Sequence, residues 1–511
     1  MLDATPLLRL YARRRLAQLE RQDAVAVQRR LLRRLLRRAA GTRFGRDHGF
    51  GAIREVADYQ ARVPLRRYED FWEEYWQQAF PRLAGATWPG PVPYVAKTSG
   101  TTSGTSKFIP VTRGTLMGNR RGVLDMMSFH LRARPDSRIL GGKNFMLGGS
   151  TELERLAPGV RAGDMTGIAA REVPSWFRGF TYPPRSLELP ADWERRLEVL
   201  GPLSLEQDIR TLAGTASWLL FFLQKLTAGQ GRGVTGCYPN LELIVYGGVN
   251  FAPYRHQYEE LLAGTEVDLR EVYPASEGFL AVADRGVGEG LRLQVDGGIF
   301  YEFVPVEELE ASAPRRFWLE TVETGVNYAV VLSTAAGAWS YILGDTVRFV
   351  ELAPPRILVT GRTSSSLSAF GEHLIEEEIV RAVTEAAETI GEEVADFSVG
   401  PVFPADEERR GHHLFVVEFA RHRPDDSRLQ AFTERLDARL AELNDDYREH
   451  RANDLQMKAP EVVAAAPGGF ADWMRSRGKL GGQNKVPRVI SDPDLLAALR
   501  DATANNRGTT T

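Results

Sequence analysis

Short runs of β-forming residues alternate with longer helical patterns from about Val92 onward, and glycine and proline mark the joins. This alternation restricts the fold more than any other feature, because strands that alternate with helices form sheets covered by helices. The pattern therefore predicts an α/β protein. We expect helices at residues 115–131, 205–226 and 252–262, and strands at 241–246, 298–304 and 328–332.

The length of the chain predicts more than one domain. A chain of 511 residues with 43% hydrophobic residues exceeds what one small domain needs. The small, polar segment GRTSSSLS at 361–368 is interpreted as a linker, which divides the chain into domains 1–362 and 363–511. The second domain is predicted to be a smaller α+β unit. Its expected elements are strands at 397–402, 413–419 and 462–465, a helix that opens at Glu372 and a helix at 427–443.

Residues 7–43 have a helical pattern in which leucines share one face and arginines surround them. These residues are Leu31, Leu32, Leu35, Leu36, Arg29, Arg30, Arg33, Arg34, Arg37 and Arg38. A basic amphipathic helix can lie on an anionic membrane. Leucines at this spacing more often pack against the body of a protein, while arginine stems cover apolar surface. We favour packing and keep the membrane surface as an alternative.

Charge and cysteine content exclude several classes of protein. The net charge of -3 gives no global positive field, so we expect no nucleic-acid partner. A single cysteine, Cys237, cannot form an internal disulfide, which favours a buried thiol and a cytoplasmic location. The apolar run at 219–223 is far shorter than the roughly 20 residues of a membrane span, and the start does not read as a secretory signal. Neither zinc-ligand spacing nor a G-x-S-x-G elbow is present in the sequence.

The loop KTSGTTSGTSKFIPVT at 97–112 is the most informative segment. Gly100 and Gly104 allow the backbone to direct several N–H groups at one anion, and Lys107 adds a positive charge. The loop does not match the Walker pattern, because Ser106 precedes the lysine and Phe108 follows it. Phosphate binding is the favoured interpretation, and an ordinary flexible loop is the alternative.

The segment VYPASEG at 272–278 carries residue types that suit a nucleotide. Tyr273 offers a flat face for a base, Ser276 a hydroxyl for a phosphate oxygen, and Glu277 a hard oxygen ligand for Mg2+. Without context, a tyrosine and a glutamate near a turn are more often a core residue and a surface residue.

Three further segments complete the set. In YILGD at 341–345, Asp345 has enough lone pairs to accept both hydroxyls of a ribose, and Gly344 allows close approach. Arg362, at the start of the linker, is placed to contact a nucleotide. In YGGVNFA at 246–252, two glycines allow the backbone to lie along an adenine edge.

Taken in order, TSGTTSGTSKFIP, YGGVNFAP, YPASEG, YILGD and GR resemble the adenylation motifs of the acyl-adenylate-forming synthetase superfamily. Within that superfamily the chain is most similar to the auxin-responsive acyl-acid amido synthetase family. The segments TRFGRDHGF, VPLRRYEDF, FGEHLIEEEIV and GGQNKVPRV support this narrower resemblance. It extends over residues 40–490.

The resemblance implies a large N-terminal lobe with a β-barrel and mixed β-sheets flanked by helices, and a small, mobile α+β C-terminal lobe. The first lobe would bind ATP and the acid, and the second would act as a lid. The implied reaction adenylates a small carboxylic acid with Mg-ATP and passes the acyl group to an amine or amino acid. Transfer to coenzyme A, or a nucleotide-binding sensor without catalysis, are the alternatives.

The resemblance also assigns roles to single residues. Tyr273 would pack on adenine, Ser276 would contact the α-phosphate, Glu277 would hold Mg2+, and Asp345 would bind the ribose with help from Arg362. Lys485 of GGQNK would be the catalytic lysine of the mobile lobe. The other nucleotide-binding residues would be Ser99, Thr101, Thr102, Ser103, Gly247, Gly248 and Ala275.

Where many members carry an aspartate or lysine hinge after the GR pair, this chain has Thr363 and Ser364. Leu131, Trp218 and Phe222 are our candidates for the acid pocket. The acid, the amine and the oligomeric state are not specified by the sequence.

Overall fold

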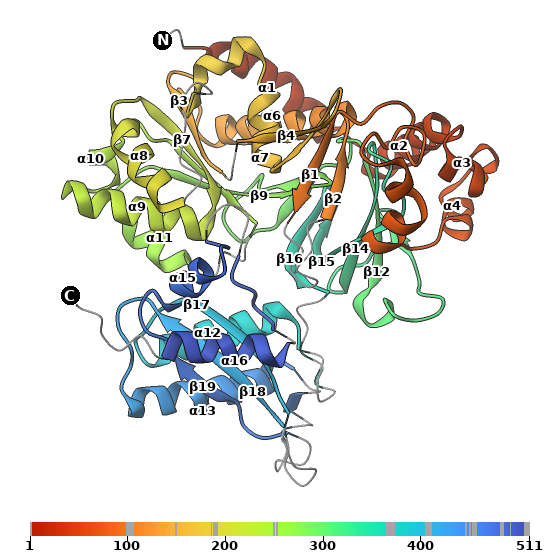
Figure 1. The fold of residues 1–511 in the computed structure, drawn as a ribbon. Helices are drawn as coiled ribbons and strands as arrows, with labels where there is room; N and C mark the ends of the chain where they lie inside the picture. The colour runs from red at the N-terminus through yellow and green to blue at the C-terminus, as the bar shows by residue number, and fades with distance from the viewer. Residues whose placement is uncertain are drawn as a thin grey trace. The chain divides into compact units, whose positions relative to one another are not determined.

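A computed structural model describes most of the chain. The described residues are 3–98, 107–148, 151–184, 187, 193–248, 251, 254–363, 367, 372, 374–403, 411–444, 447–448, 451, 457–480, 485–490 and 492–504. They form two compact units (Figure 1). The first unit comprises Met1–Val249 and Tyr258–Val359, and the second comprises Asn250–Gln257 and Thr360–Thr511.

A twelve-stranded mixed sheet forms the centre of the first unit. Its order is β13 (Phe317–Trp318), β12 (Ile299–Pro305), β14 (Asn327–Thr334), β15 (Tyr341–Leu352), β16 (Pro355–Arg362), β11 (Leu291–Leu293), β10 (Gly278–Val282), β9 (Asp268–Ala275), β8 (Leu243–Gly247), β7 (Ile209–Thr215), β3 (Lys143–Leu147) and β6 (Thr181–Tyr182). The strands from β9 to β6 pair in parallel, and the other described pairs are antiparallel. Among the described strands, β13 and β6 do not pair with each other, so the sheet is open rather than the closed barrel that we expected.

A second sheet of the first unit has the order β2 (Lys107–Val111), β1 (Tyr94–Thr98), β5 (Val160–Gly163) and β4 (Leu153–Ala157). Around the two sheets lie α1 (Thr5–Glu20), α2 (Ala24–Ala39), α3 (Arg43–Asp47), α4 (Val56–Arg62), α5 (Tyr68–Phe71), α6 (Arg113–Ala133), α7 (Met165–Arg171), α8 (Trp193–Leu205), α9 (Ala216–Gln230) and α10 (Val234–Cys237). The helix α11 (Arg255–Leu261) crosses from one unit to the other along the chain. The α/β class that the sequence predicts is confirmed.

The second unit is a three-stranded sheet with helices on both faces. The sheet has the order β17 (Val394–Val402), β18 (His412–Phe419) and β19 (Glu461–Ala464). Alternate residues of β18 enter two different cores. One core includes side chains of α12 (Glu376–Thr389) and α13 (Asp426–Leu443), and the other includes side chains of α15 (Gly469–Ser476) and α16 (Pro493–Ala504). Burial of both faces explains why β18 reads as a nearly continuous apolar run.

Most of the expected elements are found, with two corrections. The expected helix at 205–226 is wrong in its first half, because Ile209–Thr215 form β7 between β3 and β8 and helix α9 begins only at Ala216. The helix expected to open at Glu372 begins instead at Glu376. In both cases tertiary pairing or capping overrides a local pattern. Among the described residues, no helix is long and apolar enough to cross a membrane.

The basic N-terminal segment forms several helices instead of one. It breaks before α2, where Asp23 caps the helix by accepting a hydrogen bond from the Ala26 N–H at 2.9 Å. The four leucines of α2 are all buried, which confirms the packing interpretation. Cys237 is also buried, as predicted.

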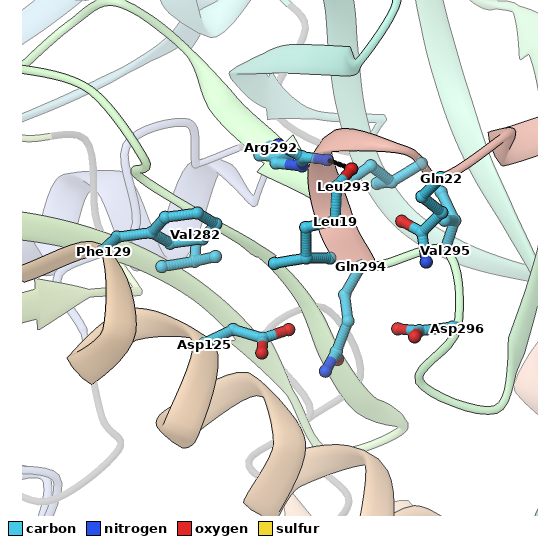
Figure 2. A pocket seen from close by; sticks show the side chains of 10 residues that line it. All are labelled: Leu19, Gln22, Asp125, Phe129, Val282, Arg292, Leu293, Gln294, Val295 and Asp296. Carbon is cyan, nitrogen blue, oxygen red and sulfur yellow. Dashed lines mark hydrogen bonds between the residues drawn. The ribbon is translucent and has the colours of Figure 1, made fainter. Parts of the chain in front are cut away.

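A buried ion cluster fixes α1 to the body of the first unit. Arg15 donates to Asp125 of α6 at 2.7 Å and to Asp296 at 2.8 Å, and the Arg15 and Asp125 side chains are 5% and 4% exposed. Figure 2 shows both carboxylates beside a pocket that Leu19 also lines, where Arg292 donates to the Leu19 carbonyl at 2.6 Å. Because Arg15 engages these carboxylates, the cluster has a structural role.

Replacing Arg15 with methionine tests that role. Arg15→Met removes the bidentate cation of the buried Asp125 and leaves Asp296 with the more distant Arg121, at 3.5 Å. We therefore expect the free energy of unfolding to fall by about 3–5 kcal/mol. Denaturant titration measures this change. The control, Arg14→Met on the exposed side of α1, is expected to change stability by less than about 0.5 kcal/mol. Equal stability of the two variants would contradict the assignment.

Candidate active site

The first component of the site is the hairpin between β9 and β10. Ala275 pairs with Gly278, so Ser276 and Glu277 form a two-residue turn. A carboxylate at the tip of a hairpin is usually exposed, but the Glu277 residue is only 8% exposed. Burial of a glutamate requires partners for its oxygens. The hairpin therefore places a carboxylate in a constrained, partly desolvated position.

The second component is a bulge in β15. Between the pairs Ile342↔Val331 and Thr346↔Ala329, three residues of β15 face a single residue of β14. Gly344 lies in this bulge with φ +92°, a conformation that glycine adopts without strain. Bulges change the direction of neighbouring side chains. The glycine of YILGD thus lets the strand turn the Asp345 carboxylate toward the hairpin.

The two components meet because the large sheet is strongly curled. Between β9 and β15 lie the strands β10, β11 and β16, and in a flat sheet four strand spacings would separate them by about 19 Å. Nevertheless, the Tyr273 hydroxyl of β9 donates to Asp345 Oδ2 of β15 at 2.6 Å. The side chains that the sequence assigned to the base and to the ribose therefore form one cluster. The Tyr273 residue is only 7% exposed, and its ring packs in the core of the sheet.

A second tyrosine completes this cluster. Tyr341, the first residue of β15, is 3% exposed, and its hydroxyl hydrogen-bonds to the Glu277 carboxylate. Burial is the main reason that the pKa of Tyr341 is raised well above its ordinary value. The negative charge of Glu277 and this hydrogen bond raise it further. The hydroxyl therefore stays protonated and donates at neutral pH.

The two glycines of YGGVNFA lie at the end of β8, next to β9. Gly247 pairs with Val272, and a Cβ added at Gly247 would lie 2.2 Å from the Val272 carbonyl oxygen. Only glycine permits this approach of the two strands. Gly248 follows with an exposed backbone, while Ala275 and Ser276 are half-buried at the nearby hairpin. The backbone is thus open beside the predicted base site.

The phosphate loop is described only at its ends. Ser99, Thr101, Thr102 and Ser103 lie outside the described residues, and their predicted contacts stay predictions. At the end of the loop, Lys107 Nζ lies 3.3 Å from Glu69 and 5.2 Å from the centre of the Tyr68 ring. The Tyr68 hydroxyl accepts the Phe108 N–H at 2.9 Å. These contacts anchor the strand that follows the loop.

Two more of the predicted residues, Lys485 and Arg362, belong to the second unit, whose longer segment begins at Thr360, before the expected boundary after Arg362. Lys485 is exposed, and Arg362 is the exposed last residue of β16. Thr363 follows Arg362 directly, and Ser364 lies outside the described residues. The roles that the resemblance gives to Lys485 and Arg362 stay predictions.

The candidates for the acid pocket have packing roles. Leu131 is buried in a cluster that includes α1 side chains. Phe222 is 2% exposed and contacts Phe145 edge-to-face, with ring centres 5.5 Å apart. Trp218 is half-buried and packs against Phe221 at 6.4 Å. Of the three, Trp218 retains the most surface for a ligand.

Sequence reasoning missed Tyr341. Within YILGD it assigned roles only to Gly344 and Asp345, although the sequence contained a signal for Tyr341. Tyr273 precedes Glu277 by four residues, and Tyr341 precedes Asp345 by the same interval. A repeated tyrosine–carboxylate spacing in two motifs was the pattern that pointed to a shared role.

The chain matches three models of one family. Residues 14–208 match the GH3 family N-terminal domain, residues 293–362 the GH3 family central domain, and residues 377–494 the GH3 family C-terminal domain. Among named relatives is a probable indole-3-acetic acid-amido synthetase, GH3.9 of Oryza sativa subsp. japonica, 26% identical over 59% of this chain and 73% of the relative. GH3.12 of the same plant, with the same description, is 23% identical over 95% of this chain and 94% of the relative.

Solved structures agree on the fold. The AtGH3.15 acyl acid amido synthetase in complex with 2,4-DB has a TM-score of 0.78 at 20% identity and covers 96% of this chain and 95% of its own. A 2-hydroxyisobutyryl-CoA ligase in the postadenylation state has a TM-score of 0.62 at 15% identity, with 95% and 94% coverage. The three domain models match in order along the chain, and both they and the fold agree with the motifs. We conclude that the chain belongs to the GH3 family.

Proposed function

We propose that this protein is an ATP-dependent acyl-acid amido synthetase. It adenylates a small carboxylic acid and transfers the acyl group to an amine, such as an amino acid, with release of pyrophosphate and AMP. The observation that carries this proposal is the meeting of Tyr273, Glu277, Tyr341 and Asp345 at one place in the curled sheet. Membership of the GH3 family supports it.

Activation requires the acid to attack a phosphate. A carboxylate oxygen of the acid bonds to the α-phosphorus of ATP, and the bond from phosphorus to the pyrophosphate oxygen breaks. Two anions approach each other in this step, so their charge must be neutralised. The donor set fits a nucleotide with its cation, because Glu277 supplies a hard, buried oxygen and Asp345 supplies acceptors for ribose hydroxyls. Mg2+ held at Glu277 would supply positive charge beside the phosphates.

The second step forms the amide. The amine nitrogen attacks the acyl carbon, the carbon–oxygen bond to the phosphate breaks, AMP leaves, and the nitrogen loses a proton. A free carboxylate does not react in this way because oxide is a poor leaving group. We assign residues 1–362 to ATP and acid binding and 363–511 to a mobile lid that carries Lys485. The hydroxyl of Ser276, beside Glu277, is assigned to the α-phosphate.

The decisive experiment measures both half-reactions. Acid-dependent exchange of pyrophosphate into ATP is screened over aromatic, indolic, jasmonate-like and aliphatic acids, and the best acid is then offered amino acids or coenzyme A. Mass spectrometry distinguishes an amide from a thioester. An amide supports the proposal, and a thioester identifies a CoA ligase. Lack of exchange with every acid favours a nucleotide-binding sensor.

The ribose assignment predicts the effect of Asp345→Ala. Loss of a charged hydrogen-bond acceptor should weaken ATP binding by about 1.5–3 kcal/mol, measured by calorimetry. Glu351→Ala on the same strand removes a carboxylate that pairs with Arg285 and Arg356, and this control should bind ATP as the wild type does. Unchanged ATP affinity of folded Asp345→Ala would remove Asp345 from the site.

The lid assignment predicts a separation of the two half-reactions. The charge of Lys485 should stabilise adenylation, in which negative charge redistributes around phosphorus, more than aminolysis. Lys485→Ala is therefore expected to lower pyrophosphate release by about 100-fold and to form amide from presynthesised acyl-AMP at nearly the wild-type rate. Lys458→Ala, at another exposed lysine of the second unit, is the control. Equal loss of rate in both half-reactions, or no loss of rate in either, would contradict the role assigned to Lys485.

A further inference from the structure

The two carboxylates of the site are each held by the tyrosine of the other motif. Tyr273 and Glu277 belong to the hairpin, whereas Tyr341 and Asp345 belong to β15. Tyr273 donates to Asp345 at 2.6 Å, and Tyr341 hydrogen-bonds to Glu277. The contacts are thus reciprocal and join two segments that are distant in both sequence and strand order.

We infer that Tyr273 and Tyr341 are positioning residues, which form a reciprocal clamp that orients Asp345 toward the ribose and Glu277 toward the metal-bound phosphates. The inference rests on the proposed function for the identity of the ligands. It assigns a role to the Tyr273 hydroxyl, in addition to any contact of the Tyr273 ring with adenine. It also assigns a role to Tyr341, which the sequence analysis did not.

The packing of both rings supports this inference. Tyr273 lies in the core formed by the large sheet, and Tyr341 lies in a different core with side chains of the N-terminal helices. The Tyr341 ring lies 6.1 Å from that of Phe71. A ring fixed by packing presents its hydroxyl from one direction, so it restricts the rotamers of the carboxylate that it contacts.

The chemistry of the donor also suits a positioning role. A tyrosine hydroxyl occupies one lone-pair direction of a carboxylate that can accept about four hydrogen bonds. At Asp345 the bond is made to Oδ2, which leaves acceptor capacity for a ribose diol. A hydroxyl adds no positive charge, so it orients Glu277 without cancelling the charge that attracts a divalent cation.

The experiment removes each hydroxyl and keeps each ring. For Tyr273→Phe we expect ATP affinity to fall about 10-fold while affinity for 2′,3′-dideoxy-ATP stays at the wild-type value, because only ATP presents the hydroxyls that Asp345 binds. For Tyr341→Phe we expect ATP binding to need about 10-fold more Mg2+, the size of effect seen for groups that orient metal ligands. Both are measured as equilibrium binding, which does not depend on turnover.

Double variants and a control make the test specific. Tyr273→Phe should have no further effect in Asp345→Ala, and Tyr341→Phe none in Glu277→Gln. Tyr301→Phe is the control, because the Tyr301 hydroxyl is buried in the same sheet but donates to backbone carbonyls. The ratio of affinities for the two nucleotides is independent of the folded fraction, so a poorly folding variant still gives an answer.

The outcomes separate the clamp from the proposed function. Equal loss of ATP and dideoxy-ATP affinity in Tyr273→Phe, or an unchanged Mg2+ requirement in Tyr341→Phe, would overturn the clamp even if the wild type forms amides. Conversely, the two variants could show the expected shifts while the wild type binds ATP but forms no acyl-adenylate. That result would support the clamp and overturn the synthetase proposal.

Discussion

The curl of the twelve-stranded sheet is the constraint on which the site depends. Four strand spacings separate β9 from β15 along the hydrogen-bonded order, and only a sheet bent back toward itself brings Tyr273 within 2.6 Å of Asp345. Register shifts in the β9–β10 and β14–β15 pairs increase local twist and bending. The same irregularities that bend the sheet also determine where the carboxylates point, so fold and site share one cause.

The N-terminal helical region stabilises the position of β15. Arg66 donates its backbone N–H to the Ser340 carbonyl at 3.0 Å and accepts the Ile342 N–H at 2.8 Å, which encloses Tyr341 between two backbone hydrogen bonds. Two residues later, Tyr68 accepts the Phe108 N–H. The segment VPLRRYEDF, which supported the family resemblance, therefore contacts both the strand of the ribose carboxylate and the strand that follows the phosphate loop.

Local patterns predicted elements well but not how those elements meet. The strands β12, β14 and β18 are short, nearly continuous apolar runs because both of their faces are buried. Helix α13 instead buries every fourth residue, Phe432, Leu436 and Leu440, which is the pattern of a helix with one buried face. The segment Ile209–Thr215, IRTLAGT, was misread because it lies directly before the apolar helical pattern of α9, and its pairing with β3 and β8 is not visible in the local sequence. The roles predicted for Glu277 and Asp345 came from their chemistry together with the family resemblance. Tyr341 was missed although its spacing from Asp345 repeats that of Tyr273 from Glu277. That spacing does not identify the carboxylate that Tyr341 contacts, which lies in a hairpin more than sixty residues earlier in the chain.

Two groups of buried or half-buried carboxylates in the first unit have described contacts of different kinds. Asp125 and Asp296 are held by the guanidinium of Arg15. Asp296 also lies 3.5 Å from Arg121, so two positive charges balance the two carboxylates and the cluster stabilises the fold. Glu277 and Asp345 are each contacted by a tyrosine hydroxyl, which supplies a hydrogen bond but no charge. An arginine in that place would compete with a cation for the same oxygens. A tyrosine hydroxyl instead restrains the carboxylate without adding a positive charge of its own, which is the physical reason that tyrosine suits these two positions.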